Sequence, residues 1–244
     1  MNLTILHFYP DLMNLYGSYA NVAVLKRLLE RVGHAVNVRT VVPNDTVSLS
    51  DADFVYMGAG TERRQKFALS DFTRYAEELR SALRDGLPAL FAGTAMELLG
   101  QTITDADGKT FDGIAVAPFS TVQQARRIVG DVYAHTDLFP EPVVGFMNKS
   151  AVIADVDAPF LSALDMGYGN ETERGPEGWR GWNALASELT GPLLVKNPSA
   201  LECVAASVLT RKGIALPDAW SVDTWARQGY AVTAQELAAR CQKA

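Results

Sequence analysis

The sequence predicts an α/β fold in which a mostly parallel, doubly wound sheet carries an antiparallel excursion at its side. Over the first hundred residues, short apolar runs alternate with amphipathic, helix-sized segments, which is the pattern of βαβ units. Four strand-like runs then follow without helices between them. The chain has 244 residues, 48% of them hydrophobic, so it can bury a large core.

Four short runs predict the strands of the parallel sheet. They are Leu3–Phe8, His34–Val42, Asp53–Gly58 and Leu87–Ala92. Three of them are almost entirely apolar, and the second alternates between apolar and polar residues. Both patterns are typical of strands that are buried on at least one face.

Two amphipathic segments predict the helices between these strands. Ala20–Val32 places its leucines and valines at helical spacing, and Ser18 is a candidate cap for it. Ser70–Arg84 predicts a second helix, capped by Ser70 or Asp71, with the loop GAGTERRQ before it. A third, short helix is expected after the fourth strand.

The pattern changes after Gly100. Antiparallel strands are predicted at Gly113–Phe119, Arg126–Ala134, Pro142–Asn148 and Ser150–Val156. Because the segment 166–183 is Gly-rich and polar, it predicts a long mobile loop. Loops of that length inside a compact domain are often functional. A returning strand is predicted at 184–190.

The C-terminal part of the chain predicts helices only. Residues 198–212 form one helical segment, and the tail from Pro217 holds two more. No linker demands a second core. We therefore expect one domain over residues 1–212 and a C-terminal helical extension, residues 213–244, packed on the same domain.

Composition excludes several classes of function. The net charge is -6 and no run of Lys and Arg exceeds two residues, which disfavours a nucleic-acid surface. No apolar stretch approaches the roughly 20 residues of a membrane span. Cys203 and Cys241 are expected to be reduced thiols in a cytoplasmic protein. Since no His or Cys pair has metal-ligand spacing, we expect neither a metal nor a cofactor.

One stretch, GLPALFAGTAMELLG from Gly86 to Gly100, predicts a strand, a tight bend and a helix. In many α/β hydrolases and amidotransferases this bend carries a nucleophilic Ser or Cys. Here the apex is Gly93, which has no side chain. Glycine also removes the backbone strain that other residues bear at such a bend.

Six motifs occur in an order and spacing that resemble one family. They are HFYPDLMNLYGSYANVAVLKR, GAGTERRQ, GLPALFAGTAMELLG, GFMNKS, GYGNETE and LTGPLLVKNP. Over about residues 1–212 the chain resembles the class I glutamine amidotransferase subunit (GatD) of lipid II isoglutaminyl synthase, which is akin to cobyric acid synthase glutaminase domains. The resemblance implies a flavodoxin-like fold. It also implies hydrolysis of glutamine and transfer of ammonia to a Mur-ligase-like (MurT-like) partner that amidates a peptidoglycan precursor.

The resemblance also implies a catalytic Cys at the bend and a catalytic His before the Gly-Pro of LTGPLL. This sequence has Gly93 at the first position and Thr190 at the second. Glutamine hydrolysis of this kind needs a thiolate to attack the amide and an imidazole to move protons. In GFMNKS, Lys149 stands where the family usually has a His. The sequence therefore predicts a glutaminase-like subunit without its catalytic pair.

Five further residues are candidate substrate contacts. Gly58, Ala59 and Gly60 resemble the family's oxyanion loop, and Arg127 resembles an Arg that holds glutamine. Thr94 is either a substitute hydroxyl or a helix-capping residue. The three loop residues also fit a tight connection that needs small side chains, and Arg127 also fits a solvated strand end.

Three functions remain open on the sequence. The leading hypothesis is a non-catalytic subunit that binds a Mur-ligase-like enzyme. The first alternative is an active amidotransferase that supplies ammonia by a route not visible in the motifs. The second is a sensor that binds glutamine or a related small molecule in the former glutamine pocket and responds through the Gly-rich loop 167–181.

Overall fold

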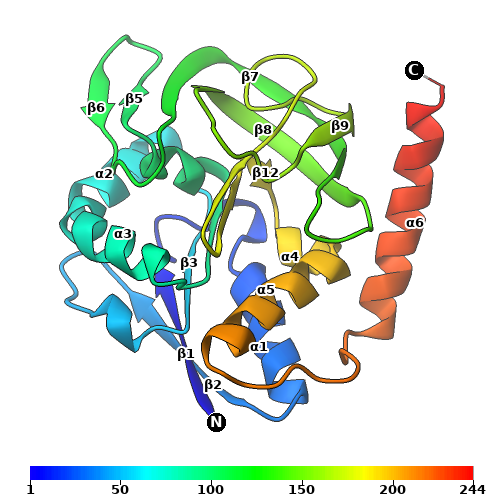
Figure 1. Cartoon of the computed structure of the whole chain (residues 1–244). Coiled ribbons are helices and arrows are strands. Elements are labelled where there is room, and N and C mark those ends of the chain that lie inside the picture. The colour runs from blue at the N-terminus through cyan, green and yellow to red at the C-terminus, as the bar shows by residue number, and fades with distance from the viewer. Residues whose placement is uncertain (244) are drawn as a thin grey trace.

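A computed structural model describes residues 1–243 as two sheets with helices packed around the first (Figure 1). The first sheet has the strand order β10-β11-β4-β3-β1-β2. In chain order its strands are β1 (Asn2–Phe8), β2 (Ala35–Val41), β3 (Phe54–Met57), β4 (Ala89–Ala92), β10 (Trp179–Gly181) and β11 (Ala184–Ser187). All neighbours pair in parallel except β10 with β11. The predicted parallel, doubly wound sheet is confirmed.

Helices cover both faces of this sheet. Successive residues of its strands point to opposite sides, and both sides carry apolar side chains that need to be buried. Along β1, Leu3 and Ile5 pack with residues of α1 (Ala20–Arg31) and α5 (Pro198–Arg211). Leu6 and Phe8 pack on the other side. Their partners there come from α2 (Glu62–Phe72) and α3 (Ala76–Arg84).

The predicted helix 70–84 is wrong at its start. The helix α2 begins eight residues earlier, after Thr61, whose hydroxyl accepts a hydrogen bond from the Arg64 N–H at 3.3 Å. Ser70 and Asp71 lie inside α2. The Asp71 carboxylate accepts from the Tyr9 hydroxyl at 2.6 Å, a tertiary contact that a capping rule cannot foresee. A 3₁₀ turn, η3 (Thr73–Tyr75), separates α2 from α3.

The predicted cap of the first helix is also wrong. The helix α1 follows Tyr19 and has no side-chain cap. Ser18 is buried, and its hydroxyl lies 2.5 Å from the hydroxyl of Tyr56 on β3. The short 3₁₀ turns η1 (Leu15–Gly17) and η2 (Leu49–Asp51) precede α1 and β3.

The second sheet contains the predicted antiparallel excursion and has the order β12-β8-β7-β5-β6, with β9 also paired to β7. Its strands are β5 (Thr102–Thr104), β6 (Thr110–Asp112), β7 (Ser120–His135), β8 (Val143–Ala154), β9 (Ala163–Met166) and β12 (Leu189–Thr190). All pairs are antiparallel except β5 with β7.

Several strand boundaries in this region differ from the sequence prediction. Residues 113–119 form no strand. The two strands predicted at 142–148 and 150–156 form one continuous strand, β8. Lys149 pairs with Ile128 within the ladder, and its long side chain is buried. The strand predicted at 184–190 is split between the two sheets as β11 and β12.

The segment predicted as a long mobile loop is held at its base. The ammonium of the buried Lys149 donates to the carbonyls of Gly169 and Asn170, at 2.5 and 2.9 Å. The amide side chain of Asn170 in turn pairs with the N–H and carbonyl of Gly178. The end of the segment then enters the first sheet as β10.

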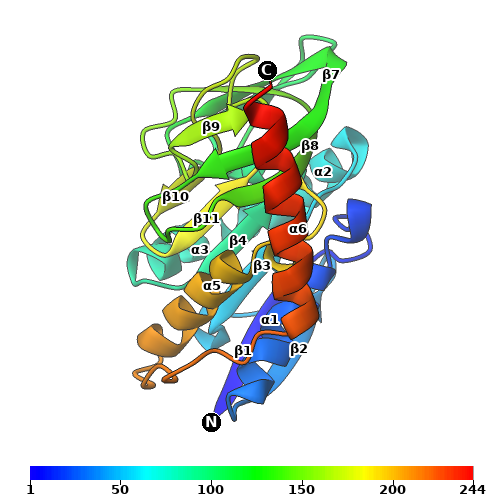
Figure 2. The ribbon, with the colours of Figure 1, turned by 90° about the vertical axis from the view of Figure 1, so that its right-hand side faces the viewer.

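Two helices complete the described chain. A single turn, α4 (Leu193–Lys196), precedes α5. The helix α6 (Thr224–Cys241) runs past the second sheet, where it lies against β7, β8 and β9, and it also lies against α4 and α5 (Figure 2). From Pro217 to residue 243 the chain forms this one helix rather than the two predicted. Arg227 pairs with Glu202 on α5, and the Tyr230 hydroxyl donates to the Pro142 carbonyl at 2.8 Å.

Candidate active site

The bend after β4 has the predicted geometry. Gly93 has φ of +60°, a backbone conformation that residues other than glycine rarely adopt. The chain turns there directly into a 3₁₀ helix, η4 (Gly93–Leu99), so the short helix begins at the bend and not at Met96 as predicted. The whole of η4 is buried.

The space in front of Gly93 is filled by the loop after β3. A Cβ atom placed on Gly93 would lie 2.6 Å from the Cβ of Ala59 and 3.3 Å from its Cα. A separation as short as 2.6 Å is essentially never seen for a real Cβ atom. No side chain therefore fits at residue 93 unless the loop moves.

The backbone N–H groups expected to form an oxyanion hole already have partners. The Gly60 N–H donates to the Thr94 hydroxyl at 2.9 Å, and that hydroxyl lies 3.1 Å from the Gly60 carbonyl. The Ala59 N–H donates to the Ser18 hydroxyl at 3.4 Å. A Cβ on Gly58 would press against the same hydroxyl, so glycine is required there. Thr94 thus serves to join two loops and makes no side-chain cap.

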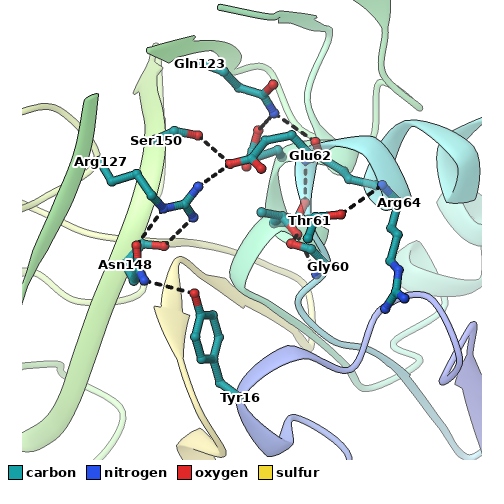
Figure 3. A network of polar contacts seen from close by, with 12 residues as sticks. Tyr16, Gly60, Thr61, Glu62, Arg64, Gln123, Arg127, Asn148 and Ser150 are labelled. Carbon is teal, nitrogen blue, oxygen red and sulfur yellow. Dashed lines mark hydrogen bonds and ion pairs between the residues drawn. The ribbon is translucent and has the colours of Figure 1, made fainter. Parts of the chain in front are cut away.

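Arg127 lies in the irregular part of β7, where the pairing with β8 shifts register. Its guanidinium donates to the Asn148 side-chain oxygen at 2.6 Å, the Asn148 carbonyl at 2.9 Å and the Glu62 carboxylate at 2.5 Å (Figure 3). Ser150 also donates to Glu62, at 3.0 Å. A substrate carboxylate at Arg127 would have to compete with the carboxylate of Glu62.

The Glu62–Arg127 pair is held in its charged form. Burial raises the pKa of Glu62, but hydrogen bonds from its backbone N–H, from Arg127 and from Ser150 outweigh burial and leave the pKa below 4.5. Glu62 is the first residue of α2, where a carboxylate also interacts favourably with the helix dipole.

Thr190 lies on β12, opposite Phe146 of β8. Its hydroxyl donates to the Phe146 carbonyl at 3.1 Å, and the residue is only 7% exposed. Two residues further along β8, Asn148 donates to the Tyr16 hydroxyl at 2.9 Å. The structure therefore brings Thr190 to the strand that carries the Arg127 network, but a threonine hydroxyl cannot accept and return a proton near neutral pH.

Four ionisable residues that the sequence did not single out as a group lie buried behind these loops: Glu97, Lys149, Glu177 and Glu188. Burial raises the pKa of Glu97 and of Glu177 to about 7. Burial and the nearby Glu97 carboxylate raise the pKa of Glu188 well above its usual value, and burial lowers the pKa of Lys149. The ammonium of Lys149 interacts through its charge with all three carboxyls.

These groups were missed because their contacts join residues far apart in sequence. Gln123 on β7 donates to Gln65 on α2 at 2.8 Å and to Glu97 on η4 at 2.7 Å. For the Glu62–Arg127 pair the sequence holds one local signal. Glu62 directly follows the helix cap Thr61, and an acidic residue there indicates a helix start but not a partner for Arg127.

A cavity of about 360 Å³ opens beside Arg127. It is lined by Glu62, Lys66, Asp105, Ala106, Asp107, Gln123, Gln124, Ala125, Arg127 and Ser150. It offers charged and amide groups to a small polar molecule, but it is lined by neither a Cys nor a His.

Residues 1–243 lack both a metal-ligand cluster and a membrane-spanning helix. In that part of the chain no three His, Cys, Asp or Glu side chains are grouped so that they could hold a metal ion. None of the helices described there combines the length and the apolar character needed to cross a membrane.

Comparison with known proteins agrees with this architecture. Residues 4–198 match the model of the CobB/CobQ-like glutamine amidotransferase domain. The chain is 30% identical over 212 residues to the GatD subunit of lipid II isoglutaminyl synthase (glutamine-hydrolyzing) from Staphylococcus aureus, covering 87% of this chain and 86% of that protein. It is also 30% identical to the GatD subunit from Streptococcus pneumoniae, covering 86% and 82%.

A solved structure shares the fold at much lower identity. A glutamine amidotransferase from Thermotoga maritima superimposes with a TM-score of 0.51 at 11% identity, over 98% of this chain and 94% of that one. The strand order, the bend at Gly93 and these matches lead to one assignment. The chain belongs to the family of CobB/CobQ-like glutamine amidotransferase domains.

Proposed function

We propose that this protein is a GatD-like subunit that has lost glutaminase activity and acts by associating with a Mur-ligase-like (MurT-like) enzyme in the amidation of a peptidoglycan precursor. The family membership and the names of its two relatives support the subunit role. Its work is then to hold the ligase in shape or to complete a route for ammonia. Such a ligase uses ATP, which fits a cytoplasmic location.

One observation carries the loss of activity. Residue 93 is a glycine in the left-handed region with the Ala59 methyl group against it, so neither a nucleophile nor the space for one is present. The remaining catalytic needs are unmet in the same region. The Gly60 N–H is bonded to Thr94, and Thr190 has no group that could act as a base.

Glutamate release from glutamine tests this proposal directly. We expect the purified chain, alone or with its ligase, to release no glutamate above the uncatalysed background. Loss of a nucleophile and its base typically removes several orders of magnitude in rate. A rate that survives further purification and rises in proportion to protein concentration would instead support the active amidotransferase of the first alternative.

The cavity beside Arg127 is the observation that favours the sensor alternative. Its polar lining suits glutamine or a related amino acid, although Glu62 already occupies the guanidinium. Thermal shift of the isolated chain with glutamine, compared with an equal concentration of alanine, separates the two functions. No specific shift is expected for a subunit that acts only through its partner.

A further inference from the structure

We propose that Ala59 is a nucleophile-excluding residue: its methyl group, held in place by the loop around it, closes the bend at residue 93 to every side chain. This inference deepens the proposed loss of glutaminase activity and rests on it for its biological meaning. The methyl group of Ala59 lies against the position that a Cβ on Gly93 would occupy.

The contact between residues 59 and 93 leaves no room for a Cβ on Gly93. Two atoms of Ala59, Cβ and Cα, lie 2.6 and 3.3 Å from the place where a Cβ on Gly93 would stand. A flexible side chain could turn away, but a methyl group has no rotamer to change. Only a backbone movement of the loop after β3 or of the bend would relieve the overlap.

The loop after β3 is not free to move away from the bend. The Ala59 carbonyl accepts from the Leu15 N–H at 2.8 Å. A Cβ on Gly58 would press on Ser18, and one on Gly60 would lie 2.5 Å from the Met13 sulfur. Gly58 and Gly60, which flank Ala59, are therefore packed against their neighbours as closely as Gly93 is packed against Ala59. Each of these packed neighbours would have to shift with Ala59.

The bend at Gly93 is also joined by hydrogen bonds to the segment that follows β3. The Thr94 hydroxyl is bonded to the backbone of Gly60, and the Thr94 carbonyl accepts from the Gln65 side chain at 2.8 Å. Both bonds are buried. They fix the separation of residues 59 and 93, so the overlap is a property of the fold and not of one loose loop.

A set of variants separates the contact from backbone strain. Gly93→Ala adds only a Cβ, at φ of +60°. Gly213→Ala is the strain control, because Gly213 has φ of +69° and nothing within 4 Å of the added atom. Ala59→Gly and the double variant Ala59→Gly with Gly93→Ala complete a double-mutant cycle. Thermal unfolding midpoints are measured for all five proteins, including the wild type.

We expect Gly93→Ala to lower the midpoint in the wild-type background by at least about 4 °C more than Gly213→Ala does. In the Ala59→Gly background the same substitution should lower it clearly less, because only the 3.3 Å contact with the Cα of residue 59 remains. If Gly93→Ala alone fails to fold and the double variant folds, the proposal is supported. Equal losses in both backgrounds, or failure of both to fold, overturn it.

This outcome is independent of the glutaminase assay. A wild-type chain that hydrolyses glutamine would refute the proposed function, yet the contact between residues 59 and 93 could still be measured. Additive behaviour in the cycle would refute the exclusion by Ala59 while leaving an inactive subunit intact.

Discussion

Glu188 is a buried carboxyl group with one unsatisfied oxygen. It is 1% exposed, and its Oε1 atom has no hydrogen-bond partner. Glu97, Glu177, Lys149 and Arg127 are the charged groups that act on it. A carboxyl in such surroundings keeps its proton to a higher pH than it does in the unfolded chain.

The raised pKa makes stability depend on pH in a defined direction. Between about pH 4.5 and the folded pKa, the native state holds a proton that the unfolded state has lost, so stability falls as pH rises. Glu188→Gln removes this dependence. We expect its free energy of unfolding, relative to the wild type, to rise from pH 5 to pH 8 by up to about 1.4 kcal/mol per pH unit.

Denaturant unfolding at several pH values measures this difference. His7, whose pKa is lowered to about 4 by burial, opposes the trend below pH 6.5, but it is present in both proteins and cancels. The exposed Glu236 on α6 supplies the control substitution Glu236→Gln. A difference that stays flat across pH for Glu188→Gln would show that Glu188 is ionised in the fold.

The bend offers a second residue-scale prediction. The triple variant Ala59→Gly, Gly93→Cys and Thr190→His should present an accessible thiol at residue 93. We expect that thiol to react with a small electrophile about tenfold faster than Cys203, because a helix N-terminus and an imidazole favour the thiolate whereas burial raises the pKa of Cys203.

Alkylation followed by peptide mass spectrometry compares the three thiols in one sample. The double variant Gly93→Cys with Thr190→His, which keeps Ala59, is the matched control and should be less stable. A thiol at residue 93 that reacts no faster than Cys203 would mean that this bend does not present its apex to solvent.

At the scale of elements, one side chain fastens the segment 167–178 to β8. Lys149 donates to the carbonyls of Gly169 and Asn170 and is the cation among three buried carboxyls. Lys149→Met should cost about 1–3 kcal/mol of stability, because it leaves the buried carbonyls of Gly169 and Asn170 without their donor. It should also release the base of the segment.

Limited trypsin digestion tests that release. Cleavage after Arg174, within the segment, should accelerate in Lys149→Met more than cleavage after Arg211 at the end of α5. Asn197→Ala is a useful comparison. Asn197 fastens α5 to β8 through both backbone groups of Val144, so its loss should destabilise the fold without favouring Arg174. Equal acceleration at both sites would refute the local role of Lys149.

For the whole molecule, the proposed function requires a stable partner. We expect co-expression with a Mur-ligase-like protein to give one heteromeric peak in size-exclusion chromatography, with an interface of at least about 1,600 Å². Separate elution at micromolar concentration would remove the main support for a subunit role.

Size-exclusion chromatography also tests how the chain divides into a folding unit and a C-terminal extension. We propose that residues 1–212 form the folding unit and that residues 213–244 are an extension, joined to it by ion pairs of α6 such as Arg240 with Asp131. A chain ending at Lys212 should fold with a modest loss of stability. If it elutes only as aggregate, α6 is part of the core unit.

The sequence by itself determined the architecture of the parallel sheet and the identity of the bend. Short apolar runs separated by amphipathic helices leave few topologies, because right-handed crossovers and buried strands constrain the order. The absence of a nucleophile could also be read directly, since Gly93 has no side chain. These inferences depend on local pattern or on residue type alone.

Only the tertiary structure decided how the site is filled. Ala59 and Gly93, Thr94 and Gly60, and Glu62 and Arg127 are contacts between segments far apart in sequence. Periodicity carries no information about such pairs, because they arise from the packing of different loops over one sheet edge. For the same reason Ser70 was misread as a helix cap, and β8 was misread as two strands around Lys149.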